Sequence, residues 1–174
     1  TSVANDDHHC RWVNIWSGCG LRSWLSIVAA GWKQIDCKRW DIVLVGTLAA
    51  LLNSTLGIVQ SVVYTPLLRR VEPERGPLFI VGHWRSGTTV LHHLLSLDPQ
   101  FTYANNYICF AAHHFLLTEW LLRPGFDWLA PATRPMDNFP LLSGEPQEDE
   151  FALLARNAPS PYRTLAFPDL FASF

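Results

Sequence analysis

The stretch 77–97, with the sequence PLFIVGHWRSGTTVLHHLLSL, constrains the fold of this chain more strongly than any other feature. It opens with an apolar run, Leu78–Val81, that has the length of a buried strand. After a loop bounded by glycines, apolar residues recur at helical spacing at positions 90, 94 and 97. We therefore predict a buried strand, a tight loop and an amphipathic helix that begins at about Gly87.

The loop between these two elements carries groups that bind anions. The first backbone N–H groups of a helix have no partner inside it, and the helix dipole makes that end positive. Two glycines, Gly82 and Gly87, allow these N–H groups to converge on one point. Arg85 adds a planar, charged guanidinium to the hydroxyl groups nearby. The predicted phosphate or sulfate site consists of Gly82, His83, Trp84, Arg85, Ser86, Gly87, Thr88 and Thr89.

The glycine spacing is nearly that of the NTP-binding P-loop, G-x-x-x-x-G-K-[ST]. Four residues separate Gly82 from Gly87, as that motif requires. However, Thr88 stands where the motif has the lysine that reaches the terminal phosphates of ATP. This difference argues against an ordinary kinase or ATPase and favours a related anionic donor bound without Mg²⁺. A P-loop kinase or NTPase stays as the alternative enzyme class.

The sequence FIVGHWRSGTTVLHHLLSLDP resembles the 5′-phosphosulfate loop of the sulfotransferase family, in particular its bacterial branch with an -RSGTT- core. Further segments resemble the same branch: HHFLLTE at His113–Glu119, RPMDN at Arg134–Asn138 and PQEDEFAL at Pro146–Leu153. Members of the family transfer a sulfuryl group from 3′-phosphoadenosine 5′-phosphosulfate (PAPS) to a hydroxyl or amine. The resemblance implies PAPS as co-substrate, no metal, and a small-molecule, lipid or glycan acceptor.

The elements after the loop predict an α/β fold. Phe101–Tyr103 reads as a short second strand, and Asn105 or Asn106 caps a helix that runs to about Arg123. The order strand, loop, helix, strand, helix predicts a P-loop-like three-layer α/β/α arrangement with a parallel sheet that is incomplete in this chain. A last helix is expected to start at Glu145–Pro146. Its predicted buried face consists of Phe151, Leu154, Ala155 and Ala158.

Before this α/β domain, which we place at 71–174, we expect a disordered tail at 1–10 and a helical segment at 11–70. Residues 21, 24, 25 and 28 are apolar at the spacing of an amphipathic helix. Ile42–Val63 has no charged residue and is just long enough to span a bilayer, but polar Asn53–Thr55 interrupts it. We favour a membrane-associated or core-packed helical hairpin, split at this triplet, over a true span.

Sulfuryl transfer needs a cradle for the phosphosulfate, positive charge on the leaving oxygens and a base for the acceptor proton. We predict that Arg85 supplies the charge. Glu148 precedes Phe151 by three residues, so we place its carboxylate on the inward stripe and predict it as the base. His113 and His114 compete with it, and at most one of them faces a site, because adjacent helical residues point about 100° apart.

Charge and cysteine usage exclude other classes of function. The net charge of -2 and the lack of a basic patch argue against a nucleic-acid partner. The four cysteines are scattered without metal or redox spacing, which favours free thiols and a cytoplasmic location, with peripheral membrane contact left open. The family's arginine and serine for the 3′-phosphate have no match here, so we expect an N-terminal fragment. The non-enzyme alternative is an inactive, truncated, membrane-associated module.

Overall fold

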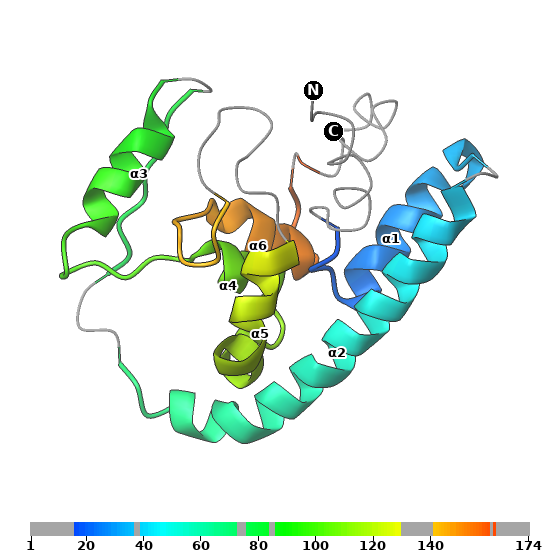
Figure 1. Ribbon diagram of the computed structural model, residues 1–174, viewed down its shortest axis with the longest axis horizontal. Coiled ribbons are helices and arrows are strands. Elements are labelled where there is room, and N and C mark those ends of the chain that lie inside the picture. The colour runs from blue at the N-terminus through cyan, green and yellow to red at the C-terminus, as the bar shows by residue number, and fades with distance from the viewer. Residues whose placement is uncertain are drawn as a thin grey trace.

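The computed structural model describes residues 16–36, 39–72, 76–83, 86–129, 141–160 and 162. Its helices are α1 (Leu21–Gly31), the 3-10 helix η2 (Trp32–Gln34), α2 (Trp40–Leu68), α3 (Thr88–Ser96), α4 (Asn106–Phe110), α5 (Phe115–Leu129) and α6 (Asp149–Ala155). Figure 1 shows α4, α5 and α6 together, with α2 along one side and α3 on the other. The predicted tail at 1–10 and the RPMDN segment lie outside the described residues.

The amphipathic helix predicted near residue 21 is confirmed as α1, and it packs antiparallel against the first half of α2. Trp24 is buried, and its Nε1 donates a hydrogen bond of 2.9 Å to Thr47 Oγ1. At the other end of the contact, the Leu21 N–H donates to Ser54 Oγ at 2.7 Å. A Cβ on Gly46 would lie 2.4 Å from the Trp24 ring, so the two helices approach closely only because this position is glycine.

The split predicted at Asn53–Thr55 is wrong, because α2 is one continuous helix through this triplet. Its polar side chains find partners without ending the helix: Asn53 Nδ2 donates to the carbonyls of Ser17 and Cys19, and Thr55 Oγ1 donates to the Leu51 carbonyl one turn back. In the part of the chain that the structure describes, α2 is the one helix long and apolar enough to cross a membrane by length and composition.

The helix predicted from Asn105 to Arg123 is divided in two. Asn105 caps it as expected, since its Oδ1 accepts from the Ile108 N–H at 2.8 Å. However, α4 ends at Phe110, and a turn at 111–114 precedes α5. That turn lets the two adjacent histidines bond to different partners, as described below.

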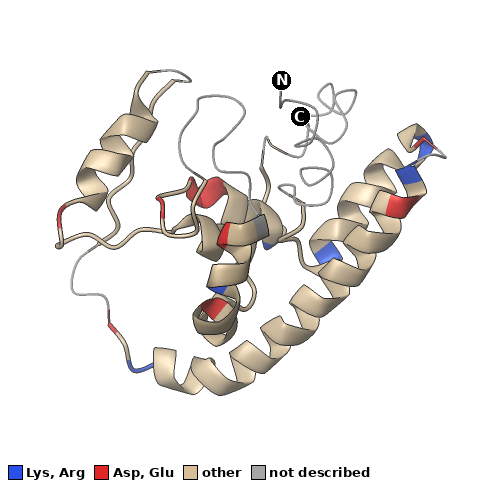
Figure 2. Ribbon diagram, in the orientation of Figure 1, with Lys and Arg blue, Asp and Glu red and all other residues tan. Residues whose placement is uncertain are grey.

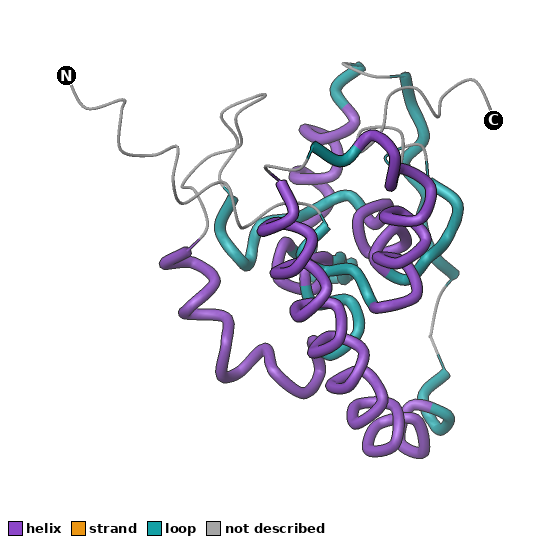
Figure 3. Tube along the Cα trace, turned by 90° about the vertical axis from the view of Figure 1, so that its right-hand side faces the viewer, coloured by secondary structure: helices purple, strands orange, loops and turns teal. Residues whose placement is uncertain are grey.

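The predicted strands are not formed among the described residues, which contain helices, loops and one isolated antiparallel bridge, between Asn105 and Pro146 (Figure 3). Leu78–Val81 is irregular, and the side chains of Phe79 and Val81 are 78% and 91% exposed. A strand needs neighbours for its N–H and C=O groups, and the described chain provides none here. The three-layer sheet of our prediction is therefore not seen, whereas the helices expected around it are.

The last helix also begins later than predicted. Pro146 takes part in the bridge and the Gln147 N–H donates to the Ala104 carbonyl at 3.0 Å, which holds this segment extended. The helix α6 therefore starts at Asp149, with Glu148 as its N-cap residue. Leu154 and Ala155 are buried as expected, and Ala158 lies beyond the helix and is half-buried.

Candidate functional site

The loop before α3 has part of the predicted geometry of an anion site. The helix begins at Thr88, as predicted, and its N-cap Gly87 has φ 89°, a left-handed conformation that favours glycine. The first hydrogen bond across this turn runs from the Leu91 N–H to the Gly87 carbonyl at 3.0 Å. The N–H groups of Thr88–Val90 precede that bond and have no acceptor within the helix. They lie at the positive end of the helix dipole.

Gly82 favours the loop for a different reason, which is space rather than backbone conformation. A Cβ at this position would lie 2.6 Å from Thr88 Cγ2 and 2.8 Å from Ser86 Oγ. The backbone at the start of the loop therefore runs directly beneath the first residue of α3. The two glycines of the motif thus serve two purposes: Gly82 permits close approach and Gly87 permits the turn.

Ser86 differs from its predicted role in the cradle. Its N–H donates to the His83 carbonyl at 3.1 Å and its Oγ donates to the same oxygen at 2.5 Å, so both donors close the loop on itself. Trp84 and Arg85 lie outside the described residues. In the described part of the loop, the donors for an anion are the amides of the first turn and the hydroxyls of Thr88 and Thr89, whose residues are half-buried.

Beside α3 lies an open hollow of about 410 Å³ that sequence reasoning did not predict. Its lining includes the apolar side chains Val90, Leu94 and Leu97. His93 projects from the same face of α3, and its Nδ1 lies 3.7 Å from Glu145 Oε2. The only signal for this histidine was its position about one helical turn beyond the loop. The hollow therefore combines an apolar wall with a histidine–carboxylate pair.

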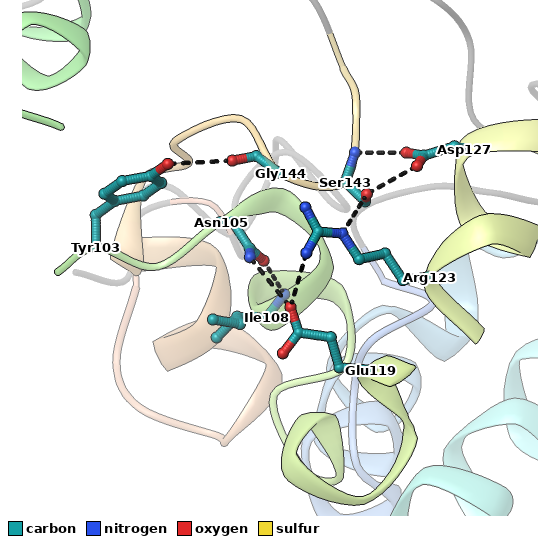
Figure 4. Close-up of polar contacts among 8 residues, drawn as sticks. All are labelled: Tyr103, Asn105, Ile108, Glu119, Arg123, Asp127, Ser143 and Gly144. Carbon is teal, nitrogen blue, oxygen red and sulfur yellow. Dashed lines mark hydrogen bonds and ion pairs between the residues drawn. The ribbon is translucent and has the colours of Figure 1, made fainter. Parts of the chain in front are cut away.

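A polar network holds the turn that carries Glu145 in place (Figure 4). Ser143 donates to both carboxylate oxygens of Asp127, from N–H at 2.6 Å and from Oγ at 2.9 Å. Arg123 Nε donates to Ser143 Oγ at 3.0 Å. A Cβ on Gly144 would lie 2.5 Å from the Arg123 guanidinium. These contacts tie the turn that carries Glu145 to α5.

Glu148 lies on the surface, so its predicted inward orientation is wrong. Because α6 starts at Asp149 and not at Glu145–Pro146, Glu148 is an N-cap residue and falls outside the buried stripe of the helix. Its Oε2 accepts a hydrogen bond of 2.6 Å from the Tyr162 hydroxyl. In Figure 1, α6 lies in the central group and α3 apart from it. The predicted role of Glu148 as the base stays untested.

The two adjacent histidines, His113 and His114, connect helices through hydrogen bonds. His113 Nε2 lies 3.0 Å from the Ala155 carbonyl at the end of α6, and burial lowers the pKa of His113. His114 Nδ1 lies 2.8 Å from Thr118 Oγ1 and its Nε2 lies 3.1 Å from Asn53 Oδ1, which joins α5 to α2. Burial lowers the pKa of His114 as well. These contacts give both side chains a structural role.

The described residues contain no group of three or more His, Cys, Asp or Glu side chains placed to hold a metal ion. Two of the four cysteines, Cys19 and Cys109, are described, and both are buried.

Comparison with known proteins gives two kinds of match. Residues 77–158 match the sequence model described as the sulfotransferase family. Two relatives, from Mycobacterium bovis and Mycobacterium tuberculosis, both carry the name omega-hydroxy-beta-dihydromenaquinone-9 sulfotransferase Stf3. Each is 40% identical to this chain over 155 residues. No solved structure matches the chain.

The extent of these matches is uneven. The alignment covers 89% of this chain but only 40% of each relative, so the chain spans about 40% of the length of the curated relatives it matches. The 155 aligned residues outnumber those from residue 77 to the C-terminus, so the similarity extends into the helical part before the family match. Both matches contain the whole loop of Gly82–Thr89 and the whole of α3. Residues 77–158 of the chain belong to the sulfotransferase family.

Proposed function

We propose that the protein represented by this chain transfers a sulfuryl group from PAPS to the hydroxyl group of a lipid alcohol. The observation that carries the proposal is the loop of Gly82–Thr89, whose two glycines and uncapped first turn suit a doubly anionic phosphosulfate. The lipid acceptor is suggested by the substrate in the name of the relatives, a hydroxylated menaquinone derivative.

In this reaction the acceptor oxygen forms a bond to sulfur, while the bond between sulfur and the bridging phosphate oxygen breaks. The products are a sulfate ester and 3′,5′-ADP. The amides of Thr88–Val90 would hold the phosphosulfate, and Arg85 would neutralise the charge that develops on the leaving phosphate. The acceptor proton must pass to a base.

For that base, the geometry favours His93 over the two residues predicted from sequence. His93 is on α3, the same helix that forms the anion cradle, and Glu145 lies close enough to orient its ring. The apolar wall beside it suits a hydrocarbon chain. Glu148 is instead bonded to Tyr162, and His113 to the Ala155 carbonyl. We therefore place His93 first, Glu148 second and His113 third.

The test is a calorimetric titration of the chain with 3′,5′-ADP. We expect saturable binding without Mg²⁺, and Arg85→Ala should weaken it by about tenfold or more, because a charged hydrogen bond contributes about 1.5–3 kcal/mol. The matched control is Arg69→Ala, an exposed arginine at the end of α2, which should leave the affinity unchanged. Lack of saturable binding, or an equal loss in both variants, would contradict the proposal.

The same titration separates the alternatives. A P-loop kinase or NTPase would bind ATP with Mg²⁺, and this ATP would displace 3′,5′-ADP. An inactive membrane-associated module would bind neither nucleotide.

A further inference from the structure

The two faces of α2 are reversed relative to a helix in a soluble protein, where the apolar stripe faces the core. The face toward α1 and α5 consists mainly of small or polar residues: Gly46, Thr47, Ala50, Asn53, Gly57 and Gln60. It also includes Val43, which packs against the buried cluster around Trp24. The opposite face, here called the outer face, carries aliphatic side chains that are 51–72% exposed: Leu44, Leu48, Leu51, Leu52, Ile58 and Val62. The polarity of the helix is therefore suited to protein on one side and hydrocarbon on the other.

Contacts on the polar face fix the rotation of α2 about its axis. Thr47 accepts from Trp24, and Asn53 contacts His114. Further along, Gln60 Oε1 accepts from the Leu117 N–H of α5 at 3.2 Å. A Cβ on Gly57 would lie 3.2 Å from His113 Cβ, so α2 also lies close to the turn before α5. The outer face consequently cannot turn inward without breaking these bonds.

Charge is confined to the two ends of α2. Between Asp41 and Arg69 the sequence has no charged residue, and Figure 2 shows the helix uncoloured over this length. Trp40, which is 52% exposed, stands at one end, where an aromatic side chain suits the boundary between headgroups and acyl chains. A protein–protein interface of this length would be expected to have a polar rim and available hydrogen-bonding groups. The exposed hydroxyls in the middle of α2, on Thr55 and Ser61, instead donate to carbonyls of the helix itself.

We propose that the outer face of α2 binds the acyl chains of a lipid bilayer, with the helix lying along the membrane surface. A spanning orientation is disfavoured by the contact at the middle of α2. There Ser54 Oγ accepts a hydrogen bond from the Leu21 N–H, and Arg22, the residue after Leu21, is exposed. A spanning α2 would carry this arginine to the centre of the bilayer, where a charged side chain is costly. An in-plane α2 inserts only its apolar face, to a depth of about 5–10 Å.

The first experiment is flotation of the full chain with phosphatidylcholine–phosphatidylglycerol vesicles. We expect the chain to float, and Leu48→Glu/Leu52→Glu to lower the partition coefficient by about tenfold or more. The matched control is Leu121→Glu/Leu122→Glu, two exposed leucines of α5 away from the outer face, which should float like the unchanged chain. Circular dichroism of all three proteins checks that the helices are retained. A chain that does not float, or equal losses in both variants, would overturn the proposal.

The second experiment measures depth. Single cysteines at Leu44, Leu52 and Val62, with Cys10 and Cys37 changed to serine and the buried Cys19 and Cys109 kept, would carry a bimane label. An in-plane helix predicts similar quenching by brominated lipids at all three sites. Deep quenching at Leu52 with shallow quenching at Leu44 and Val62 would instead show a span and overturn the orientation. Titration with 3′,5′-ADP in parallel separates a failure here from a failure of the proposed function.

Discussion

Both α2 and α3 expose apolar side chains, but they do so in different settings. The inner face of α2 is fixed by hydrogen bonds to α1, α5 and the turn before α5, so its exposed face is what remains after packing is complete. By contrast, α3 has no buried residue, and the predicted strand before it exposes Phe79 and Val81. This comparison shows that exposure alone does not identify a membrane-binding surface: that inference also needs an opposite face whose polar groups are already bonded.

The largest effect should come from filling the closest approach on the packed side. We expect Gly46→Ala to lower the free energy of unfolding by about 2 kcal/mol, because the new Cβ would collide with the Trp24 ring. Gly125→Ala is the matched change in α5, where nothing lies within 4 Å, and it should stabilise the chain by up to about 1 kcal/mol. Urea unfolding of both variants measures the difference. Equal effects would show that α1 and α2 are not packed as described.

Nearly as large an effect should follow from removing the amide that joins three segments. Asn53→Leu would leave the carbonyls of Ser17 and Cys19 and the ring of His114 without this partner. We expect a loss of about 2 kcal/mol in the same urea assay, because these groups are buried or partly buried. Thr55→Val, on the exposed side of α2, should cost less than about 0.5 kcal/mol. A tolerated Asn53→Leu would contradict the claim that polar contacts fix the helix.

Lowering the pH should reduce the free energy of unfolding of the packed helices by a smaller amount. Burial lowers the pKa of His113 and His114 below the usual 6.5, so between the folded and unfolded pKa values the unfolded chain binds more protons. Stability therefore rises with pH through this window and is lost as pH falls below 6.5. Urea midpoints measured from pH 7.5 downward should show this loss, and His114→Gln should flatten it. A midpoint independent of pH over this range would contradict the buried, neutral histidines.

The smallest effect is expected at α3. Leu94→Ala removes a side chain that is 60% exposed, so the free energy of unfolding should change by less than about 0.5 kcal/mol. A loss of 2 kcal/mol or more would mean that α3 is packed as firmly as α2 and would remove the contrast between the two helices.

The sequence predicted the local elements of this chain better than their partners. The start of α3 at Thr88, the cap at Asn105 and the helix at Leu21 follow from short-range rules of capping and periodicity, and the structure confirms them. The break at Asn53 was predicted by the same rules and is wrong, since the bonds that satisfy this amide come from distant residues. A sheet depends wholly on such distant partners, which explains why the strand at Leu78–Val81 could not be judged from its own residues.

The site shows the same limit. The two glycines of the loop were recognisable because their spacing is local, and the structure gives a physical need for each. The pair of His93 and Glu145 could not be recognised from the sequence, because the two residues are far apart in it. They meet through the bridge at Asn105–Pro146 and the network around Ser143. Glu148 was misplaced for a simpler reason, a helix start that was predicted a few residues too early.

The most direct test of the central claim is amide NMR of the chain during addition of 3′,5′-ADP. The account predicts that the largest shift changes occur at the N–H groups of Thr88–Val90, with little change at Asn53 or His114 in the packed helical region. Shifts concentrated in that region, or no shifts at the first turn of α3 at saturation, would contradict it.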